Sequence, residues 1–178
     1  DTVMELINNG CEITKGLAYK KDGKIINTGW RSLCTNLDKL PKLNLKKEEL
    51  ADKGWAYIET ARGCVYGCKF CSESIKWSNP SSNGLYRKKS PEKVVEEIEY
   101  YYSNGITNFR FADSTLTLNQ FLKNICRLII DKKMKISWSA YSRINEVENA
   151  PLELMKKAGC ETLMMGFESG NEKGLNIK

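Results

Sequence analysis

Three cysteines in one short loop are the residues whose type and spacing most directly suggest chemistry. The loop at 62–71 reads RGCVYGCKFC, which spaces Cys64, Cys68 and Cys71 as C-x3-C-x2-C. This spacing can also line one face of a helix, where cysteine would serve as a small buried hydrophobic residue. The two glycines inside the loop argue against a helix, because glycine weakens helices and permits the positive φ angles of a wrapping loop. Three converging thiolates suit a metal centre rich in sulfur.

The remaining composition narrows the choice of metal. The chain has no His, which removes Ser–His and Cys–His catalysis and every His-containing metal site. Structural zinc normally takes four protein ligands, so it would need a fourth cysteine from elsewhere in the chain. The remaining cysteines read better as small buried residues than as ligands: Cys11, Cys34, Cys126 and Cys160. A 4Fe–4S cluster needs no fourth thiol if one iron stays open to a ligand, and an open iron indicates a catalytic role.

Beyond residue 54, segments of strand and helix character alternate. Ser90 and Pro91 mark one helix start, as N-cap and first helical residue. The strands are expected at 56–60, 106–112, 135–141 and 161–167, and the helices at 91–103, 116–132 and 151–158. This alternation predicts βαβ units and a parallel sheet. Sites of such folds lie at the carboxyl ends of the strands, so we expect chemistry in the four loops that follow them.

The first 54 residues differ in character. They predict a helix at 2–9 that ends at Gly10, then a β-hairpin around Asp22-Gly23. A linker follows at 31–53, with a brief helical stretch near 46–51. We therefore divide the chain into a connector at 1–54 and an α/β domain at 55–178. The chain has 178 residues, short of the roughly 250 of a complete (β/α)8 barrel.

Charge and hydropathy exclude several classes of protein. The net charge of +6 comes from 28 Lys and Arg against 22 Asp and Glu, spread along the chain, which favours a solvated surface over a nucleic-acid interface. No apolar run approaches the roughly 18 residues that span a bilayer, so we expect no membrane partner. The chain begins with Asp and lacks the features of a signal peptide. An odd number of cysteines, seven, argues against a secreted disulfide framework, and we expect a reducing, cytoplasmic location.

The cysteine loop resembles the motif of the radical S-adenosylmethionine (radical SAM) superfamily. The likeness includes the aromatic Phe70 before the third cysteine and Arg62-Gly63 before the first. The segment FRFADS at 109–114 is similar to the second strand of that superfamily, and MGFESG at 165–170 to its fourth.

The resemblance extends over about 55–178, and it implies an architecture. We expect an α/β, partial (β/α) TIM-like barrel that ends after about its fourth strand, with a short hairpin and linker appendage at the N-terminus. Residues 16–27 and 37–43 look like the connector that joins a cobalamin-binding domain to the radical domain in one large subgroup. The chain is therefore expected to be a piece of a longer protein, and by itself inactive if the missing parts are needed.

The same resemblance implies a mechanism and its cofactors. Cys64, Cys68 and Cys71 would hold a 4Fe–4S cluster whose open iron chelates the amino and carboxylate groups of S-adenosylmethionine. One electron, from a donor such as flavodoxin or ferredoxin, would cleave the sulfonium to methionine and a 5′-deoxyadenosyl radical. That radical would abstract hydrogen from a substrate, or support methyl transfer in cobalamin-dependent members. The cofactor would supply the chemistry, while the protein orients it and excludes water.

Contacts to S-adenosylmethionine are implied at the strand ends. Asp113 and Ser114 follow the second strand, where the superfamily holds the methionyl amino group; alternatively, Asp113 caps the helix that follows. Arg143 follows the third strand and can pair with a carboxylate of cofactor or substrate, or instead bridge to Glu146.

Three more residues are implied by position. Glu168 and Ser169 follow the fourth strand and resemble residues near the ribose hydroxyls, although a surface turn would also suit them. Phe70 would lie beside the adenine, or simply pack beneath the loop. No side chain is identified as catalytic by the sequence.

Two other functions stay open beside this one. A methylthiotransferase-like enzyme that modifies RNA or protein would use the same cysteine loop, with further domains outside this chain. A non-catalytic zinc or iron–sulfur module would use the loop only to fold. The bound metal distinguishes the last of these from the enzymes, and the substrate follows from neither fold nor cofactor.

Overall fold

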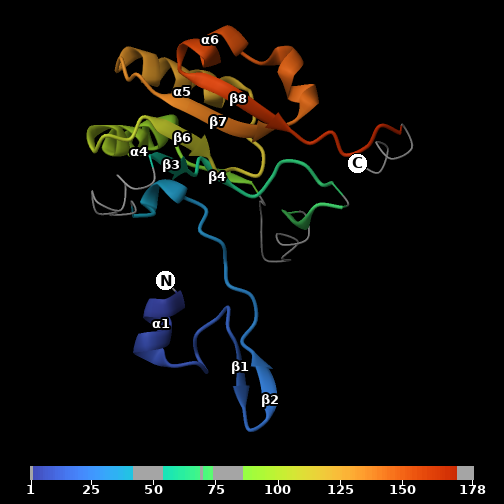
Figure 1. Ribbon diagram of the computed structural model, residues 1–178. Coiled ribbons are helices and arrows are strands. Elements are labelled where there is room, and N and C mark those ends of the chain that lie inside the picture. Colours follow the sequence, from blue (N-terminus) through green and yellow to red (C-terminus); the bar gives the residue numbers. More distant parts are fainter. Residues whose placement is uncertain (1, 42–53, 69, 74–85, 172–178) are drawn as a thin grey trace.

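A four-stranded parallel sheet forms the centre of the molecule (Figure 1). The computed structural model describes residues 2–41, 54–68, 70–73 and 86–171. The strands lie side by side in chain order: β3 (Trp55–Ile58), β6 (Asn108–Phe111), β7 (Ser137–Ser142) and β8 (Cys160–Met165). All three pairings are parallel, which confirms the sheet predicted from the alternation of elements. Parallel order brings the four carboxyl ends to one edge.

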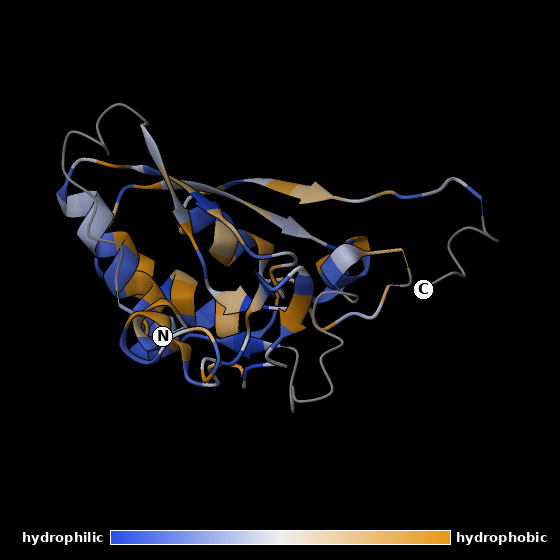
Figure 2. Ribbon diagram, turned by 90° about the horizontal axis from the view of Figure 1, so that it is seen from below, coloured by the Kyte–Doolittle hydropathy of each residue, from blue (hydrophilic) through white to orange (hydrophobic). Residues whose placement is uncertain are grey.

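Helices connect the strands and bury one face of the sheet. They are α4 (Pro91–Ser103), α5 (Gln120–Asp131) and α6 (Leu152–Lys157), with the 3-10 segment η2 (Ile144–Asn149) ahead of α6. β4 (Ala61–Arg62) follows β3 in sequence and pairs with β5 (Arg87–Lys88) in a two-residue antiparallel ribbon. Hydrophobic segments alternate with hydrophilic ones along the helices (Figure 2). No helix in the described ranges has the length and apolar character that crossing a membrane requires.

The core lies between the helices and alternate residues of the strands. Phe111 of β6 and Trp138 of β7 are buried there, with their rings edge to face and centroids 4.9 Å apart. The indole Nε1 of Trp138 also donates to the carbonyl of Ala158, at 2.9 Å. This bond satisfies the polar atom of a buried aromatic residue and fixes the turn that leads into β8.

Two helix boundaries test the sequence rules. The start of α4 is confirmed, because the Ser90 side chain accepts from the amide of Lys93 and Pro91 is the first helical residue. The start of α5 is a correction: the helix begins at Gln120 rather than at 116, with Asn119 as its N-cap. Residues 115–118 instead cross the carboxyl end of the sheet, where the amide of Leu116 donates to the carbonyl of Tyr141 at 2.8 Å.

The N-terminal unit forms a helix and a hairpin that lie apart from the sheet in Figure 1. Its elements are α1 (Thr2–Asn9), β1 (Ala18–Lys21) and β2 (Lys24–Asn27). Asp22 and Gly23 both have positive φ, which confirms the predicted tight turn. An ion pair between Glu5 and Arg31 joins α1 to the segment after β2. The predicted helical stretch at 46–51 lies outside the described residues.

Part of the predicted linker is docked on the α/β domain. Leu37, in the 3-10 turn η1 (Leu37–Lys39), is 0% exposed. The Asp38 carboxylate accepts from the amide of Ser90 at 2.8 Å, and the Arg87 guanidinium donates to the carbonyl of Cys34 at 2.9 Å. The segment at 34–38 therefore packs against β5 and the start of α4, while the domain boundary itself stays a prediction.

Replacing Gly159 by Ala tests the turn between α6 and β8. Gly159 has φ +93°, and a Cβ there would lie 2.0 Å from the carbonyl oxygen of Ile136. We expect Gly159→Ala to lower the free energy of unfolding by about 3 kcal/mol, from left-handed strain plus the forced shift of backbone. Gly105→Ala is the matched control, because Gly105 has φ +90° and open space around its Cβ position. It should cost only about 1 kcal/mol in urea unfolding, and equal losses would contradict this account.

Candidate functional site

A cleft of about 640 Å³ opens at the carboxyl end of the sheet. It is lined by the cysteine loop and by the segments that follow β6, β7 and β8. These are the four loops that the strand order selects, and the structure brings them together. The volume lies within the roughly 300–1,000 Å³ of ligand pockets in proteins.

Cys64, Cys68 and Cys71 all line this cleft, are half-buried and form no disulfide. The loop leaves β4 through Gly63, whose φ of +84° lets the chain turn away from the ribbon. Farther along, the amide of Cys71 donates to the carbonyl of Cys68 at 3.1 Å and closes a turn. Within the described ranges, no three His, Cys, Asp or Glu side chains are gathered closely enough to hold a metal ion. The three cysteines thus surround one cleft, and their role as ligands stays a prediction.

The other four cysteines do not line the cleft. Cys126 on α5 and Cys160 in β8 lie in or against the core, where burial raises their thiol pKa to about 12 and about 11. Cys11 is exposed in the N-terminal unit, and the thiol of Cys34 donates to the carbonyl of Asn36. A fourth sulfur ligand, which the zinc alternative needs, is thus not among the described residues of the cleft.

Arg143 follows β7 and lies against the cysteine loop. Its guanidinium stacks over the ring of Tyr66 with 4.1 Å to the centroid, and its Nη1 donates to Sγ of Cys68 at 3.2 Å. Glu146, the alternative partner of Arg143, instead accepts from the hydroxyl of Tyr66 and from the amide of Leu118. Burial, together with this bond to Glu146, raises the pKa of Tyr66 to about 12, so its hydroxyl stays a donor at neutral pH. Arg143 therefore presents a positive charge to the cleft beside a thiol.

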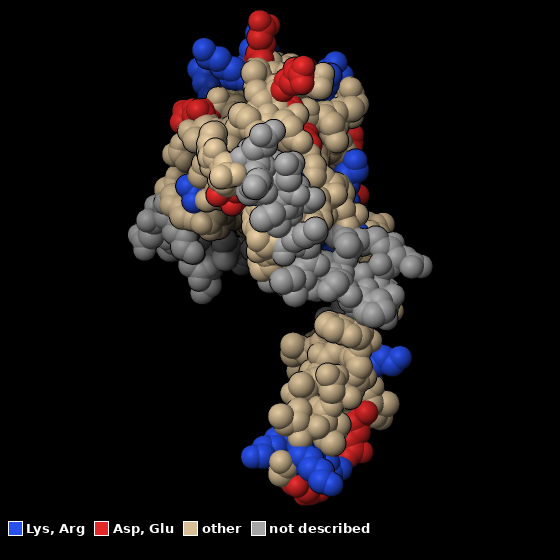
Figure 3. Space-filling model, turned by 90° about the vertical axis from the view of Figure 1, so that its right-hand side faces the viewer, with Lys and Arg blue, Asp and Glu red and all other residues tan. Residues whose placement is uncertain are grey.

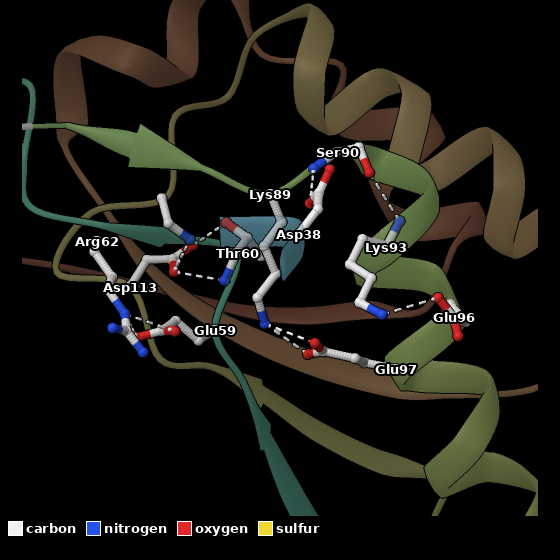
Figure 4. Close-up of polar contacts among 11 residues, drawn as sticks. Asp38, Glu59, Thr60, Arg62, Lys89, Ser90, Lys93, Glu96, Glu97 and Asp113 are labelled. Atoms are coloured by element: carbon white, nitrogen blue, oxygen red, sulfur yellow. Dashed lines mark hydrogen bonds and ion pairs between the residues drawn. The ribbon is translucent and has the colours of Figure 1, made fainter. Parts of the chain in front are cut away.

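Asp113 is 4% exposed and does not line the cleft. Its carboxylate accepts from the amides of Thr60 and Ala61, both at 2.9 Å, and from the hydroxyl of Thr60 (Figure 4). Burial raises the pKa of Asp113, although the three hydrogen bonds oppose that change. Asn119, not Asp113, caps α5. Asp113 thus joins the end of β6 to the segment before the cysteine loop, and its proposed contact with a cofactor stays a prediction.

Two ion pairs, one buried and one partly exposed, hold the scaffold behind the loop and are also drawn in Figure 4. Lys89 is 6% exposed and its Nζ lies 2.7 Å from a carboxylate oxygen of Glu97 on α4. The amide of Lys89 donates to the carbonyl of Thr60 at 2.8 Å. Arg62, next to the loop, pairs with Glu59 at 2.9 Å. Because an unpaired buried charge is costly, the Glu97 carboxylate is needed to keep Lys89 buried between the end of β3 and α4.

The other predicted contacts line the cleft. They are Phe70, Ser114, Glu168 and Ser169. Glu168 has φ +58°, rare for a residue with a side chain, and a Cβ at Gly166 would lie 2.2 Å from its Oε1. The missing side chain at Gly166 therefore gives room for the carboxylate at the cleft wall. With Arg143, the structure brings these side chains to the same cavity as the three cysteines.

Several cleft residues were missed from the sequence. Tyr141 and Met164 are partners in the register of β7 and β8 and both line the cleft, as do Met165 and Thr115. The two methionines fall inside the strand expected at 161–167, which gives them no role in the site. Their position at the last residues of a strand, where side chains reach the carboxyl edge, was the available signal.

Comparison with known families bears directly on this arrangement. The family model described as the radical SAM superfamily matches residues 58–178. The chain belongs to the radical SAM superfamily. This is a family of enzymes that use a 4Fe–4S cluster and S-adenosylmethionine, and the match begins in β3 and includes the cysteine loop and the cleft.

Curated relatives align with nearly the whole chain. It is 33% identical over 169 residues to the uncharacterized methyltransferase PH0819 of Pyrococcus horikoshii, covering 91% of this chain and 36% of that protein. It is 27% identical over 188 residues to the anaerobic magnesium-protoporphyrin IX monomethyl ester cyclase of Synechocystis, covering 98% and 36%. A putative methylthiotransferase of Methanocaldococcus jannaschii, MJ0865, is 27% identical over 169 residues, covering 89% and 36%. The chain thus spans about a third of the length of these relatives.

A solved structure confirms the expected α/β fold. The radical S-adenosylmethionine methyltransferase TsrM of Kitasatospora setae superposes with a TM-score of 0.70 at 17% identity, over 96% of this chain and 36% of that one. That structure holds a tryptophan substrate and an S-adenosylmethionine analogue, and a second structure of TsrM holds cobalamin and a 4Fe–4S cluster.

Substitution of Asp113 separates its structural contribution from any contact with cofactor. Asp113→Ala leaves buried donors of Thr60 and Ala61 without an acceptor, and we expect a loss of about 3 kcal/mol in the free energy of unfolding. Asp113→Asn keeps an acceptor for both amides and can donate to the Thr60 hydroxyl, so it should stay within about 1 kcal/mol of wild type. Urea unfolding of the metal-free chain measures both. An Asn variant as unstable as the Ala variant would show that the negative charge matters more than the hydrogen bonds.

Proposed function

We propose that this chain binds a 4Fe–4S cluster through Cys64, Cys68 and Cys71 and holds S-adenosylmethionine in the adjacent cleft, as the part of a radical SAM enzyme that cleaves this cofactor. The single observation that carries the proposal is the shared cleft. The three thiols and the carboxyl ends of β6, β7 and β8 face the same cavity of about 640 Å³. Membership of the superfamily supports the same cofactors.

The donor set suits such a cluster. Thiolates are the usual protein ligands of iron–sulfur clusters. The chain contains no His, and no other cysteine lines the cleft as described. Three ligands leave one coordination position for a small molecule, which a closed zinc site would not. In the described structure the three thiols line one cleft without forming a compact ligand group.

The walls of the cleft suit S-adenosylmethionine. The guanidinium of Arg143 can pair with its carboxylate, since a guanidinium binds carboxylates through two parallel hydrogen bonds. The hydroxyl of Ser114 can accept from its amino group, while Glu168 and Ser169 can accept from the ribose hydroxyls. Phe70, which is 54% exposed in the cleft, offers an aromatic face to the adenine.

Cys64, Cys68 and Cys71 would hold the cluster, which together with S-adenosylmethionine would supply the one-electron chemistry for hydrogen abstraction or cobalamin-dependent methyl transfer. The residues of the chain orient the cofactor and cover it. The apolar wall formed by Tyr141, Met164 and Met165 limits the access of water to the reacting end of the cleft.

The relatives favour methyl transfer as the outcome. A relative of this chain is named a methyltransferase, and the fold matches TsrM, which binds cobalamin. We infer that cobalamin is held by a domain outside these 178 residues and that a small electron carrier such as flavodoxin or ferredoxin reduces the cluster. Similarity to MJ0865 supports methylthiotransfer as the second candidate.

Electron paramagnetic resonance of the anaerobically reconstituted chain tests the proposal. We expect about four irons per chain, a reduced 4Fe–4S signal, and a change in that signal when S-adenosylmethionine is added. Replacing Cys64, Cys68 or Cys71 by Ala should abolish the signal, since each supplies one ligand. Cys11→Ala is the matched control, because Cys11 is exposed in the N-terminal unit and should leave iron content unchanged.

Two results would overturn the assignment. A chain that binds one zinc ion and no iron would favour a structural metal module. A cluster whose signal ignores S-adenosylmethionine would exclude the open iron.

A further inference from the structure

We propose that Glu146 is a positioning residue for the cysteine loop, acting through Tyr66 to hold Arg143 against Cys68. This inference rests on the proposed function, because the object being positioned is a cluster ligand. It assigns a role to two residues, Glu146 and Tyr66, that neither bind the cluster nor reach S-adenosylmethionine in the proposal above.

The first step is the contact made by Glu146 itself. One carboxylate oxygen accepts from the hydroxyl of Tyr66, which lies 80 residues earlier, between the first two cysteines. The other oxygen accepts from the amide of Leu118 at 3.1 Å, in the segment that crosses the carboxyl end of the sheet. The Glu146 side chain therefore joins three segments: the cysteine loop at Tyr66, the segment at Leu118 and η2, which carries Glu146 itself. Hydrogen bonds to an ionised carboxylate are stronger than those between neutral groups.

The second step is the contact made by Tyr66. Its ring supports the guanidinium of Arg143, at 4.1 Å from the centroid, and that guanidinium donates to Sγ of Cys68 at 3.2 Å. The bond from the hydroxyl to Glu146 fixes the tilt of the ring, and the ring in turn fixes the plane of the guanidinium. The three residues form a chain of contacts that ends on a thiol of the predicted cluster site.

The third step is the consequence for a bound cluster. Hydrogen bonds and positive charge at cluster sulfurs stabilise the reduced state and raise the reduction potential. An Arg143 released from Tyr66 samples other rotamers, because a long side chain loses conformational entropy when it is held. We therefore expect loss of the tie to Glu146 to make the cluster harder to reduce and to weaken its response to S-adenosylmethionine, although every cysteine ligand is intact.

Four variants test the chain of contacts. Glu146→Ala removes both bonds, whereas Tyr66→Phe removes only the hydroxyl and keeps the ring under Arg143. Glu146→Gln is the conservative rescue, because its carbonyl can accept from Leu118 and its amide can donate to the Tyr66 oxygen. Glu148→Ala is the matched control, since Glu148 is exposed on the same 3-10 segment.

Three quantities are measured for each variant. They are the iron content, the midpoint potential from a redox titration followed by electron paramagnetic resonance, and the S-adenosylmethionine concentration that gives half of the spectral change. Glu146→Ala and Tyr66→Phe should shift the potential to more negative values and raise that concentration about tenfold, a common effect of removing a residue behind a metal ligand. Glu146→Gln and Glu148→Ala should behave as wild type. The double variant Tyr66→Phe/Glu146→Ala should be no worse than Glu146→Ala alone, because both changes break one path.

The outcomes separate this inference from the proposed function. A wild-type chain that takes up no cluster overturns both. A wild-type chain with a cluster that responds to S-adenosylmethionine, beside Tyr66→Phe and Glu146→Ala variants with unchanged potential and response, overturns only the role of Glu146. If Glu146→Ala fails to fold, Tyr66→Phe decides, because it leaves the bond between Glu146 and Leu118 in place.

Discussion

The carboxylate of Asp113 connects the two strands on which the site depends. It accepts three hydrogen bonds from Thr60 and Ala61, where β3 gives way to β4, while its own backbone follows β6. The cysteine loop leaves β4 two residues later, and the segment that carries Ser114 leaves β6 at the same level. A buried charge with three donors keeps both chain exits in fixed relation, and its hydrogen bonds offset part of the cost of burial.

The parallel sheet then determines which residues can meet. Because β3, β6, β7 and β8 run in the same direction and in chain order, each contributes its following loop to one edge. Tyr66 and Glu146, 80 residues apart, become neighbours for this reason alone. The buried pair of Lys89 and Glu97 joins the segment after β5 to α4 behind this edge of the sheet.

The sequence defined the local features of this fold because their signals are local. The hairpin at Asp22-Gly23 and the start of α4 at Ser90-Pro91 follow from turn and capping chemistry within four residues. The start of α5 could not be predicted in that way. Leu116 and Leu118 fit the apolar stripe of a helix, but the amide of Leu116 donates to the carbonyl of Tyr141 in the neighbouring β7, and this segment lies outside the helix.

In the candidate site, too, local sequence signals predicted some features, whereas contacts between distant residues determined others. The cysteine spacing pointed to a metal, and the strand ends pointed to the residues around it. The position of Asp113 at a strand end suggested contact with a ligand, whereas its partners at Thr60 and Ala61 are more than 50 residues away in sequence and were therefore invisible. Surface charge gave no comparable signal: positive and negative side chains are interspersed on the described face in Figure 3.

The two kinds of support for the cysteine loop have different physical consequences. At its root, Arg62 pairs with Glu59 and the preceding residues are tied to Asp113 in a buried network, so this end is fixed. In its middle, Tyr66 stacks under Arg143 and its hydroxyl donates to Glu146, so this part is held by half-buried side chains from a neighbouring segment. Both supports bear on the proposal that this loop holds a cluster. The fixed root limits where the first thiol can lie, and the contacts in the middle keep a positive charge beside the second thiol.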